Sequence, residues 1–214
     1  MNINCIELKI NQTQLKREYF ETVYWWVDCE HRYHHLFKHG KEIDIKYRSI
    51  FYEFTNRYSV RRTIKGNGEI PVLNLLDQLY KNDFINKARA GEPNLIDNID
   101  KDGSGKSIRS LLSKYATLIN PLVYTMYDTR AVANLKQLDG KVVHSKFRSY
   151  TDFYTEFTKY EKSLYEQIED ADIAYYIGLC RRQGKPIDIH IFKRRLADKY
   201  LWAPNTSKDE QTTI

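Results

Sequence analysis

Apolar residues recur with helical spacing along most of the chain. From Thr13 to about His39 they fall on one helical face, and Gly40 ends the pattern. The same spacing runs from Ile43 to Val60. Because side chains three and four residues apart share one face of an α-helix, both stretches predict amphipathic helices. Residues 1–11 alternate between apolar and polar side chains, which predicts a short extended segment.

Proline and glycine limit the other predicted helices. Pro71 fits the first turn of a third helix that runs to about Ala88, after a turn at the glycines of residues 66–68. Residues 91–105 are rich in Gly, Asn and Asp and predict a loop. The remaining predicted helices are a run around Lys114 that ends at Asn120, one opened by Asp128, one capped by Thr151 that reaches about Gln167, one from Ala171 to Arg182, and one from Asp188 to Trp202.

This pattern predicts an all-α chain with about seven or eight helices in two packed lobes. Its 214 residues are enough for one well-buried core. We expect one compact domain over residues 1–204, with an N-terminal helical lobe over about 1–95 and a second region, holding the candidate site, over about 96–204. The polar residues 205–214 are expected to form a disordered tail.

Composition adds two features to this picture. The chain has 34 Lys and Arg against 28 Asp and Glu, a net charge of +6, which permits a polyanionic partner without requiring one. Aromatic residues make up 14%, and such rings either build a core or stack on unstacked bases. Neither secretion nor a membrane span is predicted, because no long apolar run is present. The three cysteines, odd in number and without metal-site spacing, indicate a reducing compartment, so we expect a cytoplasmic protein.

Lys114 and Asp128 are the candidate reacting groups. Both stand among aromatic and aliphatic residues, where a solvated surface charge is a poor explanation. Asp128 also fits the start of a helix, where a carboxylate caps the first N–H groups and is kept ionised by the helix dipole. A fixed, ionised carboxylate is also what a stabiliser of a developing cation needs, so the two roles are compatible.

Three other motifs are weaker. The stretch GSGKS at 103–107 is not the phosphate loop of nucleotide triphosphatases, because Asp100 replaces the first glycine of that pattern and no strand precedes it. A resemblance to a calcium loop fails at its last position, Arg109. The simpler interpretation is a glycine-rich hairpin whose amides can touch a phosphate. The histidines on one helical face suggest a solvated or DNA-facing stripe rather than a zinc site, and no metal is expected; they are His31, His35 and His39.

Basic and aromatic residues elsewhere have two interpretations each. Arg61 and Arg62 lie in one basic segment and Lys193 in another, and each segment either contacts phosphates or forms a solvated helix face. Trp26 either packs in the core or lines a base pocket.

Residues 100–135 resemble the helix-hairpin-helix base-excision DNA glycosylases, as a divergent branch. Lys114-Tyr115-Ala116 is similar to the Lys-x-Ala element at the end of the family's hairpin, and Tyr127-Asp128-Thr129-Arg130 to the helix start that carries its essential aspartate. In the family the glycines directly precede the lysine, whereas here Leu111-Leu112-Ser113 does, so Lys106 is the alternative family lysine. No cysteine quartet follows, so neither an iron–sulfur cluster nor another cofactor is expected.

The resemblance implies an enzyme that flips a base out of double-stranded DNA and cleaves its N-glycosidic bond. Asp128 would stabilise the charge on the sugar, and the nucleophile would be water, leaving an abasic site, or Lys114, giving a Schiff base and strand cleavage. Substrate contacts are expected from Tyr127, Tyr115 and Trp26. DNA contacts are expected from Arg130, Gly103, Gly105, Lys106, Arg61, Arg62 and Lys193.

Family members act in repair, or in defence against phages with modified, even glucosylated, pyrimidines. The Tyr-rich composition favours the defence type, because a bulky base needs a roomy polar-aromatic pocket. We expect a monomer that acts on phage DNA with modified bases. Two alternatives stay open: a non-catalytic nucleic-acid-binding helical module, in which Asp128 is only a cap, and a helical protein-interaction domain.

Overall fold

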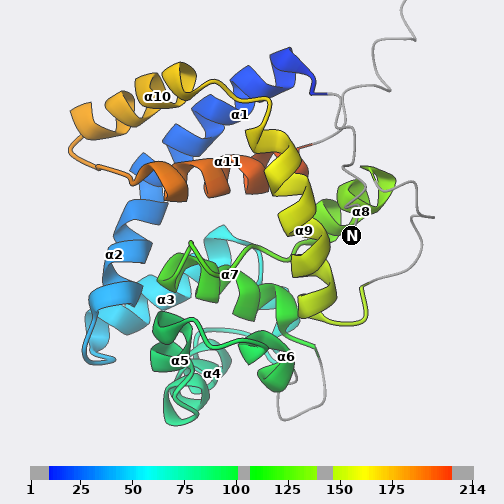
Figure 1. Cartoon of the computed structure of the whole chain (residues 1–214). Coiled ribbons are helices and arrows are strands. Elements are labelled where there is room, and N and C mark those ends of the chain that lie inside the picture. Colours follow the sequence, from blue (N-terminus) through cyan, green and yellow to red (C-terminus); the bar gives the residue numbers. More distant parts are fainter. Residues whose placement is uncertain (1–9, 101–106, 139–146, 204–214) are drawn as a thin grey trace, which may run out of the picture. The chain divides into compact units, whose positions relative to one another are not determined.

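The structure, a computed structural model, describes residues 10–100, 107–138 and 147–203 of the 214-residue chain. Within these ranges the chain forms helices α1 to α11, a π-helical turn η1 and a 3₁₀ turn η2, and it has no β-strand (Figure 1). The all-α prediction is confirmed, although the helices are more numerous than expected. No helix among them is both long and apolar enough to cross a bilayer. The predicted extended segment, up to residue 9, and the predicted tail lie outside the described residues.

The chain divides into two compact units, each built from segments that are distant in sequence. Unit 1 comprises residues Met1–Asp28, Asp128–Arg148 and Asp152–Ile214, and unit 2 comprises Cys29–Tyr127 and Ser149–Thr151. The divisions fall after Asp28, before Asp128 and on both sides of Ser149–Thr151. The reason is packing, because the first helix of the chain lies on the last one.

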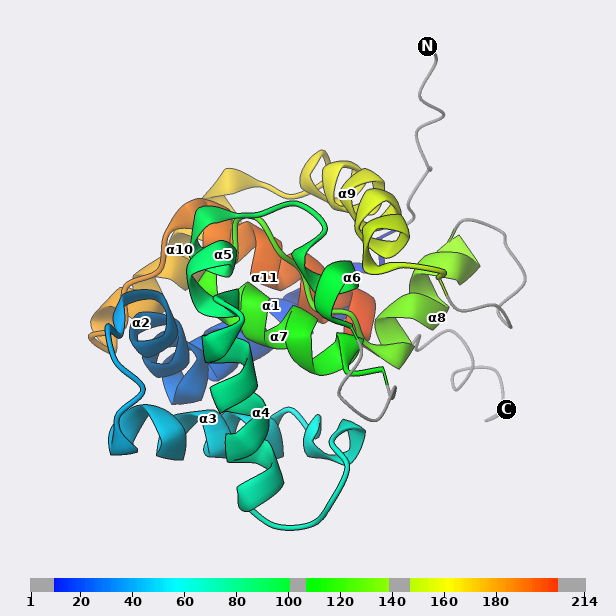
Figure 2. The same cartoon turned by 90° about the horizontal axis from the view of Figure 1, so that it is seen from below.

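Unit 1 is organised around its last helix. Helix α11 (Ile189–Trp202) packs against α1 (Gln12–Trp25), α8 (Thr129–Leu138) and α10 (Asp170–Arg182), and Figures 1 and 2 both show α1 and α10 beside it. Tyr19 stacks on Tyr176 with ring centres 4.5 Å apart and so joins α1 to α10. Helix α9 (Tyr150–Tyr165) belongs to this unit from Asp152 onward.

Unit 2 is organised around α7 (Arg109–Ile119), in which every residue from Leu111 to Ile119 is buried. The Tyr115 ring lies at its centre, 4.9 Å from the Phe51 ring and 5.0 Å from the Phe37 ring. Such edge-to-face aromatic packing adds to the stabilisation from burial alone. The other elements of unit 2 are α2 (His31–His39), α3 (Ile45–Arg57), η2 (Arg61–Thr63), α4 (Ile70–Lys81), α5 (Phe84–Ala90) and α6 (Leu95–Ile99).

Three local predictions were wrong. The single helix expected from Pro71 to Ala88 is broken by Asp83, whose φ of +59° is left-handed and cannot continue a right-handed helix. The short helix α6 lies in the expected loop. Helix α9 is capped by Asp97 rather than by Thr151, because the Asp97 carboxylate accepts the N–H groups of Tyr150 (2.6 Å) and Thr151 (3.0 Å). The turn at Gly66 and Gly68 is confirmed, since both have positive φ.

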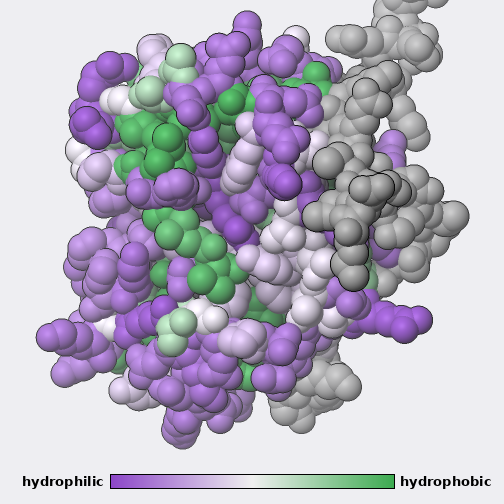
Figure 3. All heavy atoms as spheres, in the orientation of Figure 1, coloured by the Kyte–Doolittle hydropathy of each residue, from purple (hydrophilic) through white to green (hydrophobic). Residues whose placement is uncertain are grey.

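The helix predicted from Thr13 to His39 is interrupted by η1 (Trp26–Glu30). A π-turn holds one more residue than an α-turn and occurs often at functional sites. On the surface, the face in Figure 3 is mostly hydrophilic and its apolar residues form separate patches, one of them over α10.

Candidate functional site

Helix α7 carries Lys114 into the interior of unit 2. The residue is only 7% exposed, which agrees with the apolar environment expected from its neighbours in sequence. Its ammonium donates to the carbonyl oxygen of Tyr58 at 3.5 Å, and Nζ lies 5.9 Å from the centre of the Tyr58 ring. Because a buried polar group is costly without hydrogen bonds, each of these contacts offsets part of the cost of burying Lys114.

The same tyrosine holds a buried carboxylate. The Tyr58 hydroxyl donates to Oε1 of Glu30 at 2.7 Å, and Glu30 is 1% exposed. Glu30 is the last residue of the π-turn, and Ser59, which follows Tyr58, has a left-handed φ of +54° that is uncommon outside glycine. A buried acid, a phenol and a buried amine thus meet where the backbone is irregular on two segments. Sequence reasoning missed Glu30 and Tyr58.

The segment after α7 is fixed to that helix at Tyr127. The Tyr127 N–H donates to the Ser113 hydroxyl at 3.0 Å, and the Arg109 guanidinium lies over the Tyr127 ring at 5.3 Å. Arg109 in turn pairs with the Asp100 carboxylate at 2.8 Å. Burial raises the pKa of Tyr127, and the positive charge of Arg109 offsets part of this rise. Tyr127 is therefore a held, half-buried phenol, as a substrate contact would require.

Asp128 is the first residue of unit 1 and stands directly before α8. Its Oδ1 accepts the Arg130 N–H at 2.9 Å, and its carbonyl accepts the Val132 N–H at 2.9 Å. The cap interpretation is confirmed. The half-buried carboxylate receives a backbone N–H at the positive end of a helix, and both effects favour its ionised form.

An exposed cation and an exposed indole lie next to this cap. The Arg130 guanidinium sits 4.9 Å from the centre of the Trp202 ring, and Trp202 is 43% exposed. Asn134 fixes this pair, because its side-chain amide on α8 donates to the carbonyls of Leu201 (2.6 Å) and Ala203 (2.9 Å) at the end of α11. Arg130 was expected from the sequence to contact DNA, and the structure adds Trp202 beside it in the same unit.

Two predicted substrate contacts belong instead to the cores. Tyr115 is 0% exposed and shares a hydrogen bond of 2.6 Å with the hydroxyl of Tyr47. Trp26 is 3% exposed and its indole N–H donates to the Lys185 carbonyl at 3.0 Å. Their burial leaves no ring face for a base, so the predicted contacts of Tyr115 and Trp26 do not agree with the structure. Aromatic residues at helical spacing are more often core than site.

The predicted DNA contacts are distributed over both units. Arg61 donates to the Tyr52 hydroxyl (3.1 Å) and the Asn56 side chain (3.2 Å) in unit 2, next to the exposed Arg62. Lys193, in unit 1, pairs with Asp170 at 2.8 Å. Gly103, Gly105 and Lys106 lie outside the described residues. Since Lys114 and Asp128 also belong to different units, their action as a pair stays a prediction.

Helix α2 is rich in histidine, and one of these residues, His34, is partly buried against α7. His34 lies 2.8 Å through Nδ1 from the Leu118 carbonyl, and burial lowers its pKa to about 4, so it is neutral at neutral pH. The exposed rings of His35 and His39 lie 5.3 Å apart. Across the described part of the chain, no three His, Cys, Asp or Glu side chains are grouped so that they could hold a metal ion.

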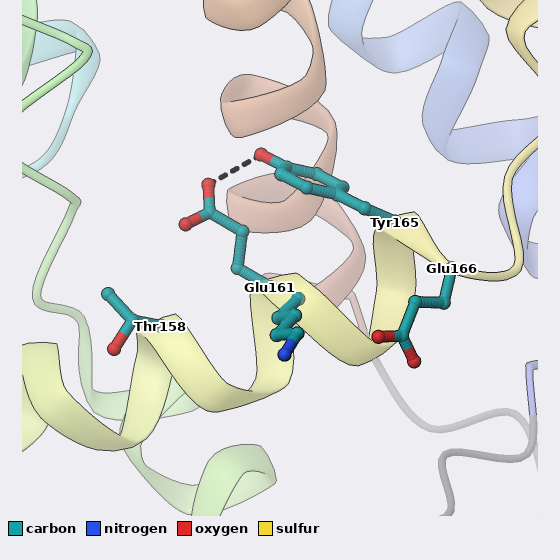
Figure 4. A pocket seen from close by; sticks show the side chains of 5 residues that line it. Thr158, Glu161, Tyr165 and Glu166 are labelled. Atoms are coloured by element: carbon teal, nitrogen blue, oxygen red, sulfur yellow. Dashed lines mark hydrogen bonds between the residues drawn. The ribbon is translucent and has the colours of Figure 1, made fainter. Parts of the chain in front are cut away.

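A surface hollow of about 360 Å³ lies along α9 (Figure 4). Its lining includes Glu161 and Tyr165, whose hydroxyl donates to the Glu161 carboxylate. Glu161 also pairs with Arg194 at 3.1 Å, so its oxygens are occupied within the protein. None of the predicted site residues lines this hollow, and its paired groups suggest a structural role.

Comparisons with known proteins add no relative to this description. No protein-family model matches the chain, no curated protein matches it, and no solved structure matches it. Its function must therefore be inferred from two groups of residues. One is the buried Lys114, Tyr58 and Glu30 of unit 2, and the other is the capping Asp128 with Arg130 and Trp202 of unit 1.

Proposed function

We propose that this protein is a DNA glycosylase, which flips a base out of double-stranded DNA and cleaves its N-glycosidic bond to leave an abasic site. The observation that carries the proposal is the Asp128 carboxylate, fixed at the start of α8 by the Arg130 N–H at 2.9 Å and preceded by the held Tyr127. The resemblance of residues 100–135 to helix-hairpin-helix glycosylases supports the same assignment.

The chemistry requires a charge in a fixed place. As the N-glycosidic bond lengthens, positive charge develops on the deoxyribose, and a carboxylate that is already ionised and held stabilises it without reorganising. Electrostatic groups of this kind contribute on the order of 100-fold to 1,000-fold in rate. Asp128 meets the requirement, because the N–H of Arg130 and the dipole of α8 both favour its charged form.

Binding of DNA is attributed to exposed cations and rings. Arg130 is exposed at the first turn of α8 and can contact a backbone phosphate, while the neighbouring Trp202 offers an exposed ring face on which a base or sugar can pack. The net charge of +6 is compatible with a polyanion. Tyr127 is the proposed contact with the flipped base.

The proposed substrate is DNA with modified bases, including the glucosylated pyrimidines of phage DNA, which would place the enzyme in antiviral defence. The high tyrosine content supports this choice, because hydroxyl-bearing rings can both pack against and hydrogen-bond a bulky base. Equal activity on unmodified host DNA would contradict the defence role while leaving the glycosylase in place.

The test is an assay of released bases by mass spectrometry. Purified protein is incubated with duplexes that carry ordinary, damaged or phage-type modified bases, beside the Asp128→Asn variant. Release of one base class that is lost in the variant is the expected result. Tight, salt-sensitive binding without release would instead favour the non-catalytic nucleic-acid-binding module, for which the observed capping by Asp128 is sufficient. Absence of any salt-dependent DNA affinity would favour the protein-interaction domain.

A further inference from the structure

The end of α11 is held by two side chains from one face of α8. Arg130 and Asn134 are four residues apart in that helix and therefore share the face. The Arg130 guanidinium lies 4.9 Å from the centre of the Trp202 ring. The Asn134 amide donates to the carbonyls of Leu201 (2.6 Å) and Ala203 (2.9 Å). One amide thus fixes the backbone on both sides of Trp202.

An exposed indole is by itself ordinary on a protein surface. Trp202, which is 43% exposed, differs because its ring is held by Arg130 and its backbone by Asn134. A ligand that packs on a side chain already held in this way avoids the entropic cost of ordering it. Arg130 and Trp202 thus form a preorganised pair of planar groups, which we call the α8–α11 platform.

The two groups of the platform match the two parts of a nucleotide. Aromatic rings stack on the flat face of a base, and a guanidinium forms strong hydrogen bonds with phosphate oxygens. A base inside a duplex is covered on both faces by its neighbours, whereas an unpaired base can turn a face to a side chain. The platform therefore suits unpaired nucleotides better than paired ones.

The platform is also linked to the proposed catalytic carboxylate. The residue whose guanidinium lies on the Trp202 ring is the same one whose backbone N–H donates to Asp128 at 2.9 Å. All four residues, Asp128, Arg130, Asn134 and Trp202, belong to unit 1. Flipping one base of a pair leaves its partner base unpaired, so the proposed reaction itself supplies a nucleotide of the required kind.

We propose that the α8–α11 platform binds one unpaired nucleotide of DNA, with the base stacked on the exposed part of the Trp202 ring and a neighbouring phosphate at the Arg130 guanidinium. Asn134 is a positioning residue, because it acts through the backbone of Trp202. The inference rests on the proposed contact of this surface with DNA and names the ligand. It does not require that a base is cleaved.

Tryptophan fluorescence tests the stacking, because a base that stacks on an indole quenches its emission. The probes are an oligothymidylate, a fully paired duplex and a duplex with one unpaired base. The two probes with unpaired bases should quench the emission of the wild-type protein, and the paired duplex should not. Equal quenching by the paired duplex would overturn the inference.

Three variants assign the signal to the platform. Trp202→Leu should abolish the quenching and weaken binding of a labelled oligothymidylate by about 5-fold to 150-fold, the range for loss of one stacked base. The control Trp25→Phe removes another indole of unit 1 and should keep both the quenching and the affinity. Arg130→Gln should weaken binding of the same probe and reduce its salt dependence. Unchanged affinity in Trp202→Leu would contradict the stacking.

A double-mutant cycle tests the positioning role of Asn134. Asn134→Leu removes both donors and should weaken oligothymidylate binding in the wild-type background. In the Trp202→Leu background the same change should weaken it little further, since its effect passes through the indole. An equal loss in both backgrounds would show that Asn134 is only structural.

None of these measurements depends on base release. Quenching by unpaired bases without any base release would refute the proposed glycosylase and keep the platform. Base release that is accompanied by no quenching and no effect of Trp202→Leu would refute the platform alone.

Discussion

Replacing Asp128 by two different residues separates its role as a helix cap from its proposed role in catalysis. Asp and Asn rank together as N-caps, so Asp128→Asn should keep the hydrogen bond from the Arg130 N–H and lose only the interaction of the charge with the α8 dipole, about 0.3–1 kcal/mol. Asp128→Ala should lose the cap as well, which costs about 0.5–2 kcal/mol. Base release, which depends on the charge itself, should fall by on the order of 100-fold or more in both variants.

The assay measures urea unfolding and single-turnover base release on the same preparations. The expected outcome is a large loss of activity in Asp128→Asn with almost no loss of stability. If Asp128→Asn keeps full activity and only Asp128→Ala is impaired, in proportion to its lower stability, then the carboxylate is a cap and the catalytic reasoning is refuted. Thr129→Ala, at the adjacent exposed position, is the matched control and should change neither quantity appreciably.

Three further predictions concern stability and binding. Burial lowers the pKa of His34 from 6.5 to about 4, so the unfolded chain binds a proton there more readily than the folded protein does. As the pH falls from 6.5 to 4, the free energy of unfolding should therefore decrease by up to about 3 kcal/mol. Unfolding of the wild type at both pH values should show this loss, and His34→Gln, which cannot titrate, should lack it. Tyr115→Phe should destabilise the folded protein by about 1–3 kcal/mol, because it leaves the buried Tyr47 hydroxyl without its 2.6 Å partner. In calorimetry the double variant Tyr47→Phe/Tyr115→Phe should recover most of this loss. An equal or larger loss in the double variant would contradict the pairing. Arg130→Gln should weaken DNA binding on all sequences and reduce the slope of log affinity against log salt by about 1. Lys193→Gln should weaken binding less, since Asp170 already accepts from Lys193. Equal effects of the two variants in a fluorescence titration would show that the ion pair of Lys193 opens on DNA.

Local pattern was enough to predict most helices and several of their ends. Apolar spacing located α3, α10 and α11, and the cap at Asp128 follows from a short polar residue before a helical run. The break at Asp83 could not be predicted in this way, because Asp is acceptable within a helix. Only the left-handed φ of Asp83 separates α4 from α5. The φ of Asp83 depends instead on tertiary packing, because α5 packs on α7, which lies farther along the chain.

The candidate site was predicted only where its residues are close in sequence. Tyr127, Asp128 and Arg130 lie within four consecutive residues, so a single sequence motif includes all three. Glu30, Tyr58 and Lys114 are far apart in sequence, and their meeting depends on packing within unit 2 and on the π-turn at η1. Tyr115 and Trp26 illustrate the opposite error, because sequence spacing does not distinguish an aromatic ring in a core from one in a pocket.

The contacts around Asp100 bear on where α7 begins. The Asp100 carbonyl accepts the Ile108 N–H at 2.7 Å, and its carboxylate binds the Ser107 hydroxyl and the Arg109 guanidinium, so the chain is closed on both sides of residues 101–106. The start of α7 is thus set by residues outside that stretch. Asp100, the last described residue before that stretch, therefore holds in place the start of the helix that carries Ser113 and Lys114.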